Sequence, residues 1–136
     1  MDNNFLRWVT ALVLLGHGIG HILGFLASWT SVPAGFADQP WVLSTDVTID
    51  SPVGRAFGLL WLIAMLAFLG AAFGLLGHQD WWRILTVAAA FISLIAILPW
   101  WNSITAEVRS AAILADLLII AALLPSWGDE FVRSIQ

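Results

Sequence analysis

The sequence contains no cysteine, no lysine and no tyrosine. Without cysteine, disulfides, thiolate nucleophiles and cysteine-ligated iron–sulfur clusters are excluded. All five basic residues are arginine, so a Schiff base to retinal or pyridoxal phosphate is excluded as well. Charged residues make up only 10% of the chain, and the net charge of −4 comes without a basic run, which argues against nucleic acid as a partner. Three histidines, nine carboxylates and the arginines remain for polar chemistry.

Apolar residues dominate instead, at 60% of the 136 residues, and the mean hydropathy is +0.91. This composition lies far outside the balance of soluble domains. The apolar segments are each about as long as the ~20 residues that cross a bilayer core. They predict helices over residues 5–28, 52–77, 81–101 and 105–125, with a long loop over residues 29–51. The predicted fold is all-α: residues 1–136 form one polytopic membrane domain, an antiparallel bundle of four transmembrane helices.

Several residues mark where the predicted helices begin and end. Ser51 is a good N-cap, and Pro52 suits the first helical position, where its missing N–H costs nothing. Gly77 predicts the end of that helix, and Pro125 predicts the end of the last one, before a short polar tail. Tryptophan occurs near almost every predicted helix end, as in the aromatic belts of membrane proteins.

The loop over residues 29–51 is too long for a tight turn. We expect its apolar side chains, such as Phe36 and Trp41, to lie on the bilayer surface or to cap the bundle. Four spans place both termini on one side of the membrane. Three of the five arginines lie on the side of the termini and two lie on the other side. Since positive charges are enriched on the cytoplasmic side, this bias predicts cytoplasmic termini.

The first predicted helix contains the stretch GHGIGHILGF, residues 16–25. Gly16, Gly20 and Gly24 recur every four residues and form a small-xxx-small stripe, which predicts a face where another helix packs closely. At 100° per residue, His17 and His21 lie beside this stripe. We therefore expect both histidines to face the bundle and not the lipid.

The depth of each residue in the bilayer adds a second constraint. His17 and Asp116 lie near the centres of the first and fourth predicted helices, Ser93 lies near the centre of the third and Met65 near that of the second. A carboxylate at this depth costs a few kcal/mol, so Asp116 must be paired or protonated. We therefore predict that His17 and Asp116 face each other across a contact between these two helices. The predicted ligand-binding residues are His17, His21, Asp116, Ser93 and Met65.

This polar set has a structural and a functional interpretation. It either holds helices together or serves a ligand, a proton or a metal. A histidine pair at i, i+4 needs a third ligand to complete a metal site, and we predict no metal. The first functional hypothesis is a lipophilic ligand: a quinone-like molecule, or haem with His17 or His21 as axial ligand. The alternative is a non-catalytic assembly or scaffold subunit that forms homo-oligomers or joins a larger membrane complex through its glycine faces.

A third hypothesis is the passage of protons or ions along the same axis. The sequence leaves open whether the protein is an enzyme. With these residues in view, the chain resembles bacterial four-helix membrane proteins whose first helix carries the run H-G-x-x-H-x-x-G-F, here residues 17–25. A Gly-Leu-Leu-Trp run at residues 58–61 adds to the likeness, and the layout is similar to that of DoxX-like families.

Some DoxX-type proteins are associated with quinone-linked sulfur oxidation. The resemblance therefore implies a lipophilic redox ligand and a bacterial plasma membrane as the location. It implies no catalytic residue.

Overall fold

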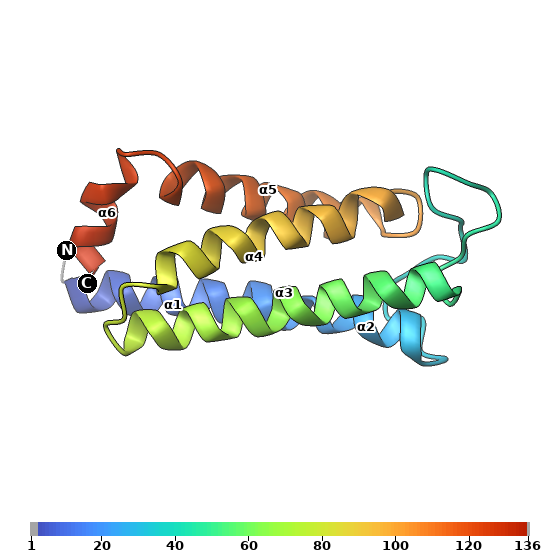
Figure 1. Ribbon diagram of the computed structural model, residues 1–136, viewed down its shortest axis with the longest axis horizontal. Coiled ribbons are helices and arrows are strands. Elements are labelled where there is room, and N and C mark those ends of the chain that lie inside the picture. Colours follow the sequence, from blue (N-terminus) through green and yellow to red (C-terminus); the bar gives the residue numbers. More distant parts are fainter. Residues whose placement is uncertain (1–2, 136) are drawn as a thin grey trace.

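The computed structural model describes residues 3–135, and all the regular secondary structure elements in this range are helices. No strand forms among these residues; Phe36 and Ile104 form an isolated antiparallel bridge. The helices are α1 (Asn3–Gly20), α2 (Ile22–Trp29), α3 (Pro52–Leu76), α4 (Trp82–Ile97), the 3₁₀ turn η1 (Leu98–Trp100), α5 (Ala106–Leu123) and α6 (Gly128–Ile135). The long helices run lengthwise, and the loop between α2 and α3 lies at the end opposite α6 (Figure 1).

Three segments are long and apolar enough to cross a membrane, namely Asn4–Trp29, Pro52–Leu76 and Trp82–Trp100. The pair α5 and α6 becomes a fourth such segment when both helices are taken together, although a bend of 92° separates them. Large apolar side chains also point outward: Leu12 is 62% exposed, Phe73 66% and Ile84 74%. Exposure of this extent is unfavourable in water and suits contact with acyl chains.

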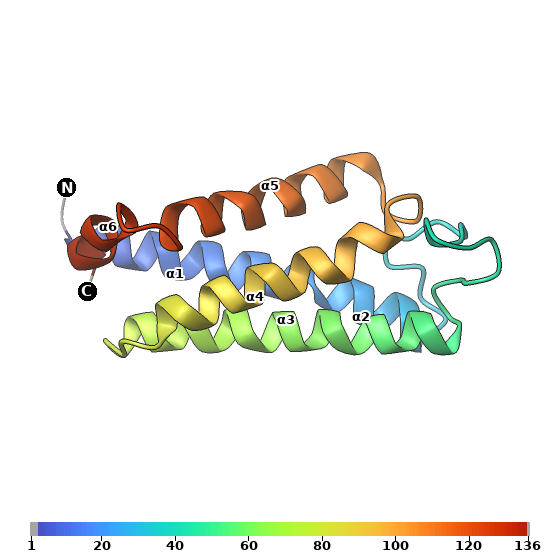
Figure 2. The same ribbon diagram turned by 45° about the horizontal axis from the view of Figure 1, so that its top comes forward.

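Packing follows the chain in part. Helix α3 contacts α4, α1 and α2, and α5 contacts α4 (Figure 2). The predicted direct packing of the first helix on the fourth is wrong, because α1 and α5 are not a closely packed pair. They diverge toward the loop end of the molecule. Their connection is instead made by polar side chains and, at the opposite end, by α6.

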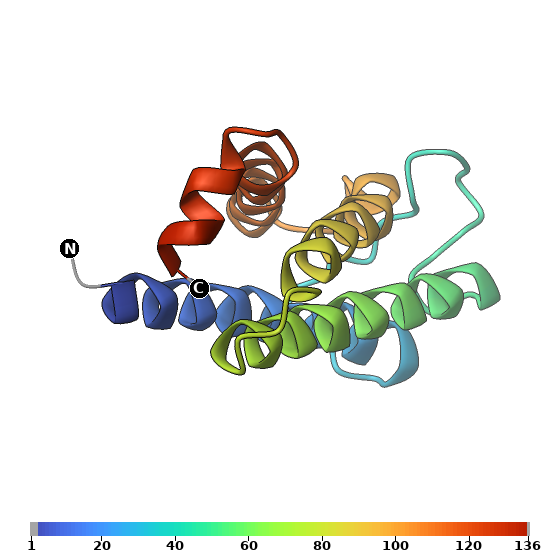
Figure 3. The same ribbon diagram turned by 60° about the vertical axis from the view of Figure 1, so that its left-hand side comes forward.

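The predicted polar tail is the amphipathic helix α6, which turns back from α5 and packs on α1 (Figure 3). Val132 and Ile135 are buried in this contact region. Arg83 of α4 holds the turn between α5 and α6, since its guanidinium donates to the carbonyls of Leu123 at 2.7 Å and Pro125 at 3.2 Å. It also pairs with Asp129 at 2.5 Å. The sequence reading missed this helix because only eight residues form it.

The predicted caps of α3 are confirmed. Ser51 accepts a hydrogen bond from the amide of Gly54 at 3.1 Å, and Gly77 ends the helix. The first span runs over Asn4–Trp29, close to the helix predicted over residues 5–28, and a one-residue turn at His21 divides it into α1 and α2. At this turn the amide of His21 donates to the carbonyl of Gly18, three residues back, which tightens the backbone into a 3₁₀-like step.

The long loop caps the bundle, one of the two placements expected for it. Phe36 and Trp41 pack on an apolar cluster around Trp61 and Trp100, and backbone hydrogen bonds join residue 37 to residue 103 and residue 42 to residue 99. Leu43 remains 72% exposed at the tip. The loop thus closes the end of the bundle at which α1/α2 and α5 diverge.

The predicted glycine stripe is only partly a packing face. Positions for a Cβ at Gly16 and Gly20 have no neighbouring atom within 4 Å, so within this chain no helix packs there. Gly24 does pack, because a Cβ there would clash with the ring of Trp61, and so does Gly18, whose Cβ position lies 2.8 Å from Cβ of Phe68. The helix that contacts the glycine-rich segment is α3. It meets Gly18 and Gly24 and leaves Gly16 and Gly20 uncovered.

This difference predicts opposite effects for two single substitutions. Gly18→Ala places a methyl group against Phe68 and the Met65 carbonyl, and we expect a loss of about 1–3 kcal/mol in the free energy of unfolding. Gly16→Ala meets open space and removes a helix-destabilising glycine, so we expect a gain of roughly 0.5–1 kcal/mol. Thermal unfolding in detergent measures both. Equal losses in the two variants would mean that a close helix contact covers Gly16 after all.

Candidate functional site

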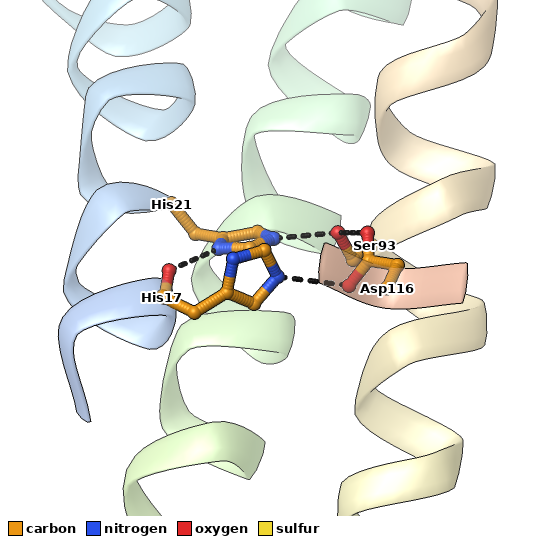
Figure 4. A network of polar contacts seen from close by, with 4 residues as sticks. All are labelled: His17, His21, Ser93 and Asp116. Atoms are coloured by element: carbon orange, nitrogen blue, oxygen red, sulfur yellow. Dashed lines mark hydrogen bonds and ion pairs between the residues drawn. The ribbon is translucent and has the colours of Figure 1, made fainter. Parts of the chain in front are cut away.

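Four polar side chains inside the molecule gather between two apolar clusters. One cluster, which includes Leu14 and Phe68, fills the α6 end, and the other, around Trp61, fills the loop end. Between them lie His17 on α1, His21 at the break before α2, Ser93 on α4 and Asp116 on α5 (Figure 4). We call these four residues the polar cluster. It joins three elements that are far apart in the sequence.

His17 and Asp116 are in direct contact, as the depth argument predicts. Nε2 of His17 lies 2.8 Å from Oδ1 of Asp116, so that prediction is confirmed. The aspartate side chain is completely buried, and the histidine is 11% exposed. Since α1 and α5 do not pack closely, this bond spans a space between the helices and is not a by-product of tight packing.

The remaining contacts extend the cluster to α4. The hydroxyl oxygen of Ser93, completely buried, lies 2.5 Å from Oδ2 of Asp116 and 2.7 Å from Nε2 of His21. Both carboxylate oxygens of Asp116 therefore have a partner, which is what a carboxyl group needs at this depth in an apolar interior. Ser93 is thus part of the cluster, as predicted.

The break in the first span orients His21. Its amide donates to Gly18, and its ring nitrogen Nδ1 lies 2.9 Å from the carbonyl oxygen of His17. The carbonyl oxygen of His17 therefore has the His21 side chain as a hydrogen-bond partner, because the His21 amide donates to Gly18 instead. The ring is held at both nitrogens and is 5% exposed, so its orientation is fixed.

Phe68 lies beside the histidines, with ring centroids 4.8 Å from His17 and 5.6 Å from His21. Met65, also predicted as a ligand-binding residue, lies on the same helix, and its carbonyl oxygen is 3.4 Å from the Cβ position of Gly18. Met65 is not among the residues that line the cavity described below. Position along a helix does not fix the direction of a side chain around it.

A cavity of about 280 Å³ opens beside the polar cluster, between the α1/α2 segment and α5. Its walls are mostly apolar and include Gly16, Gly20, Leu23, Gly24, Trp61, Ile97, Val108, Ala111 and Ala112. His17 and His21 also line it, and residues 34–36 of the loop and Ile104 lie at the loop end. The uncovered glycines therefore form a wall of the cavity. Their missing side chains leave room that a helix does not fill.

Arg109 is a third polar residue of this cavity, after His17 and His21, and it was not predicted as a site residue. Its guanidinium stacks 4.0 Å above the ring of Trp101 and donates to the carbonyls of Trp101 and Ile104. Its Nε atom is buried without a partner among the described residues. The sequence shows a basic residue near the end of a predicted helix, but its place at the cavity depends on the fold.

No group of three histidine, cysteine or carboxylate side chains within residues 3–135 is arranged to hold a metal ion. His17 and His21 lie with ring centroids 4.9 Å apart, but each is already bound to another protein group through Nε2. In comparisons with known proteins, no family model, curated protein or solved structure matches this chain. The comparisons therefore add nothing to the geometry of the site.

Removal of the Ser93 hydroxyl tests whether the polar cluster stabilises the fold. Ser93→Ala leaves His21 Nε2 and Asp116 Oδ2 without this partner, and we expect a loss of about 1–2 kcal/mol, near the upper range for interhelical hydrogen bonds in membranes. Ser110→Ala, at an exposed position of α5, is the matched control and should change stability little. Unfolding in detergent gives both values, and a Ser93→Ala variant as stable as the control would contradict a structural contribution of the bridge.

Asp116→Asn keeps the shape of the side chain in the polar cluster and removes its negative charge. The amide oxygen can accept from His17 and the amide nitrogen can donate to Ser93, so most of the network is retained. We expect Asp116→Asn to lose less stability than Asp116→Leu, which removes both contacts and leaves buried donors unpaired. The same unfolding measurement decides, and equal losses would mean that the charge itself is what the fold requires.

Proposed function

We propose that this chain is a four-span membrane protein that binds a small lipophilic molecule in the cavity between α1/α2 and α5. The observation that carries the proposal is the combination of an apolar cavity with a polar cluster at its wall. Ligand sites are typically mostly apolar, with a few fixed polar groups that orient the ligand. Here the apolar walls suit a hydrocarbon body, and the histidines supply the polar group.

The proposed topology counts α5 as the fourth span and α6 as a helix at the membrane surface. Helix α5 contains the charged residues Glu107, Arg109 and Asp116. Because of these charges, α5 alone is not among the segments that are apolar enough to cross a membrane. Two of them lie in its first turn, where an interface is expected, and the third is paired within the polar cluster. Four spans return the chain to its starting side. We propose a bacterial plasma membrane, with both termini in the cytoplasm.

A quinone-like head group is better supported than haem. Both ring nitrogens of His21 and Nε2 of His17 are already held by protein groups, so axial ligation through these atoms requires part of the cluster to break. The volume of about 280 Å³ is also small for a macrocycle and near the lower end of ordinary ligand sites, ~300 Å³. The likeness to DoxX-like families supports the same ligand class.

An assembly role has one observation in its favour. Gly16 and Gly20 are uncovered, and such positions allow close approach of a helix from a second copy or from another subunit. Occupation by a helix would fill the same space that the proposed ligand needs. The two functions are therefore alternatives at this surface and can be separated by one substitution.

Gly20→Leu fills the cavity from the α1 side without touching the polar cluster. In detergent-purified protein, an alkylated benzoquinone and, separately, its hydroquinone are titrated while tryptophan fluorescence is recorded, since Trp61 lines the cavity. We expect saturable quenching by at least one of them in the wild type and binding weakened about tenfold or more, ~1.4 kcal/mol, in Gly20→Leu. Ala56→Leu, at an exposed position of α3, is the control and should bind as the wild type does.

Equal saturable binding in wild type and Gly20→Leu would contradict a site in this cavity. Loss of a dimer or larger assembly in Gly20→Leu, together with no saturable binding of either probe to the wild type, would favour the assembly role.

A further inference from the structure

The hydrogen-bond contacts of the polar cluster determine which of its atoms carry protons. The carbonyl oxygen of His17 can only accept a hydrogen bond. Nδ1 of His21 lies 2.9 Å from it and must therefore carry a hydrogen. The open question for His21 is then only whether Nε2, which faces Ser93, carries a second one.

Ser93 has one hydroxyl hydrogen but two short contacts, 2.7 Å to Nε2 of His21 and 2.5 Å to Oδ2 of Asp116. Two contacts need two hydrogens, so one further proton lies either on His21 Nε2 or on Asp116 Oδ2. In the first case an imidazolium faces a carboxylate through the hydroxyl, and in the second both groups are neutral. The sum of the two charges is zero in both cases, which an apolar environment favours.

Both cases give the same result for His17. In each of them Oδ1 of Asp116 has no hydrogen and accepts at 2.8 Å, so Nε2 of His17 must donate. A neutral imidazole with its hydrogen on Nε2 keeps a lone pair on Nδ1. A second proton on His17 would give the cluster a net positive charge beside an apolar cavity that Arg109 also lines, and such a charge is costly there.

Nδ1 of His17 is also the ring nitrogen of the cluster that remains available. It has no hydrogen-bond partner among the described residues, whereas both nitrogens of His21 have one. This atom is not among the buried polar atoms that lack a hydrogen-bond partner, so it is accessible, and His17 lines the cavity. In Figure 4 the Nε2 edge of the ring points to Asp116, and Nδ1 lies on another edge, near His21.

We propose that Nδ1 of His17 accepts a hydrogen bond from the ligand, and that the cavity therefore selects molecules with a hydroxyl head group, of the phenol or hydroquinone class, over carbonyl or ether analogues. This inference rests on the proposed function, because it names the class of ligand for the same cavity. The donors on His21 and Ser93 are used within the protein, so a quinone carbonyl finds no matching donor at His17. Arg109 also lines the cavity, but its guanidinium donates to the carbonyls of Trp101 and Ile104, and its Nε is buried. A site built around a hydrogen-bond acceptor rejects an analogue that lacks the donor far more strongly than it rejects a change in apolar size.

The binding experiment compares an alkylated hydroquinone, its dimethyl ether and the corresponding quinone on the purified wild-type protein. We expect the hydroquinone to bind at least tenfold more tightly than the ether and the quinone. In His17→Phe, which keeps a flat ring and removes the acceptor, the three probes should bind with similar affinity. Asp116→Asn should keep the preference, because its amide oxygen can still accept from His17 Nε2.

Nitrogen-15 NMR of the histidine rings gives a readout that requires no ligand. We expect Nδ1 of His17 to be a lone-pair nitrogen and Nε2 to carry the hydrogen, and we expect the Nδ1 signal to shift when hydroquinone is added. A hydrogen on Nδ1 in the free protein, or equal binding of the three probes to the wild type, would overturn the inference while the cavity remains a binding site. Failure of all three probes to bind saturably would overturn the proposed function itself, and the inference with it.

Discussion

A carboxyl group inside an apolar helix must be paired or neutralised, and Asp116 imposes this requirement on the whole bundle. Its two oxygens reach His17 on α1 and Ser93 on α4, so three helices are placed relative to one another by one buried side chain. Close packing does not achieve the same result, because α1 and α5 stand apart. The polar cluster therefore bridges a gap between α1 and α5. The cavity beside it exists because these two helices are connected by side-chain hydrogen bonds and do not pack closely on each other.

Much of this arrangement could be predicted from the sequence. The three apolar spans of α1 to α4 follow from length and composition, and Ser51 and Gly77 mark the ends of α3 because capping depends on local geometry. The contact between His17 and Asp116 was also predictable, since depth along antiparallel helices and the cost of an unpaired carboxylate leave few alternatives. These features depend on position along the chain and along the helix axis.

Directions around a helix were harder to predict. The glycine spacing predicts a face where another helix packs closely, but α3 packs on Gly18 and Gly24 and leaves Gly16 and Gly20 open. Met65 was predicted beside the histidines, and Phe68, nearly one turn further along α3, contacts them. The break at His21 and the return of α6 onto α1 depend on tertiary contacts, such as those of Arg83 with the turn after α5, and no local pattern indicates them.

We propose that the uncovered glycines and the polar cluster form one ligand site. A structure of the protein purified in native-like lipid is the decisive measurement. We expect it to show elongated non-protein density along Gly16 and Gly20, with one polar atom about 2.6–3.2 Å from Nδ1 of His17. A helix of a second copy on these glycines, or a cavity closed by contact between α1 and α5, would contradict it.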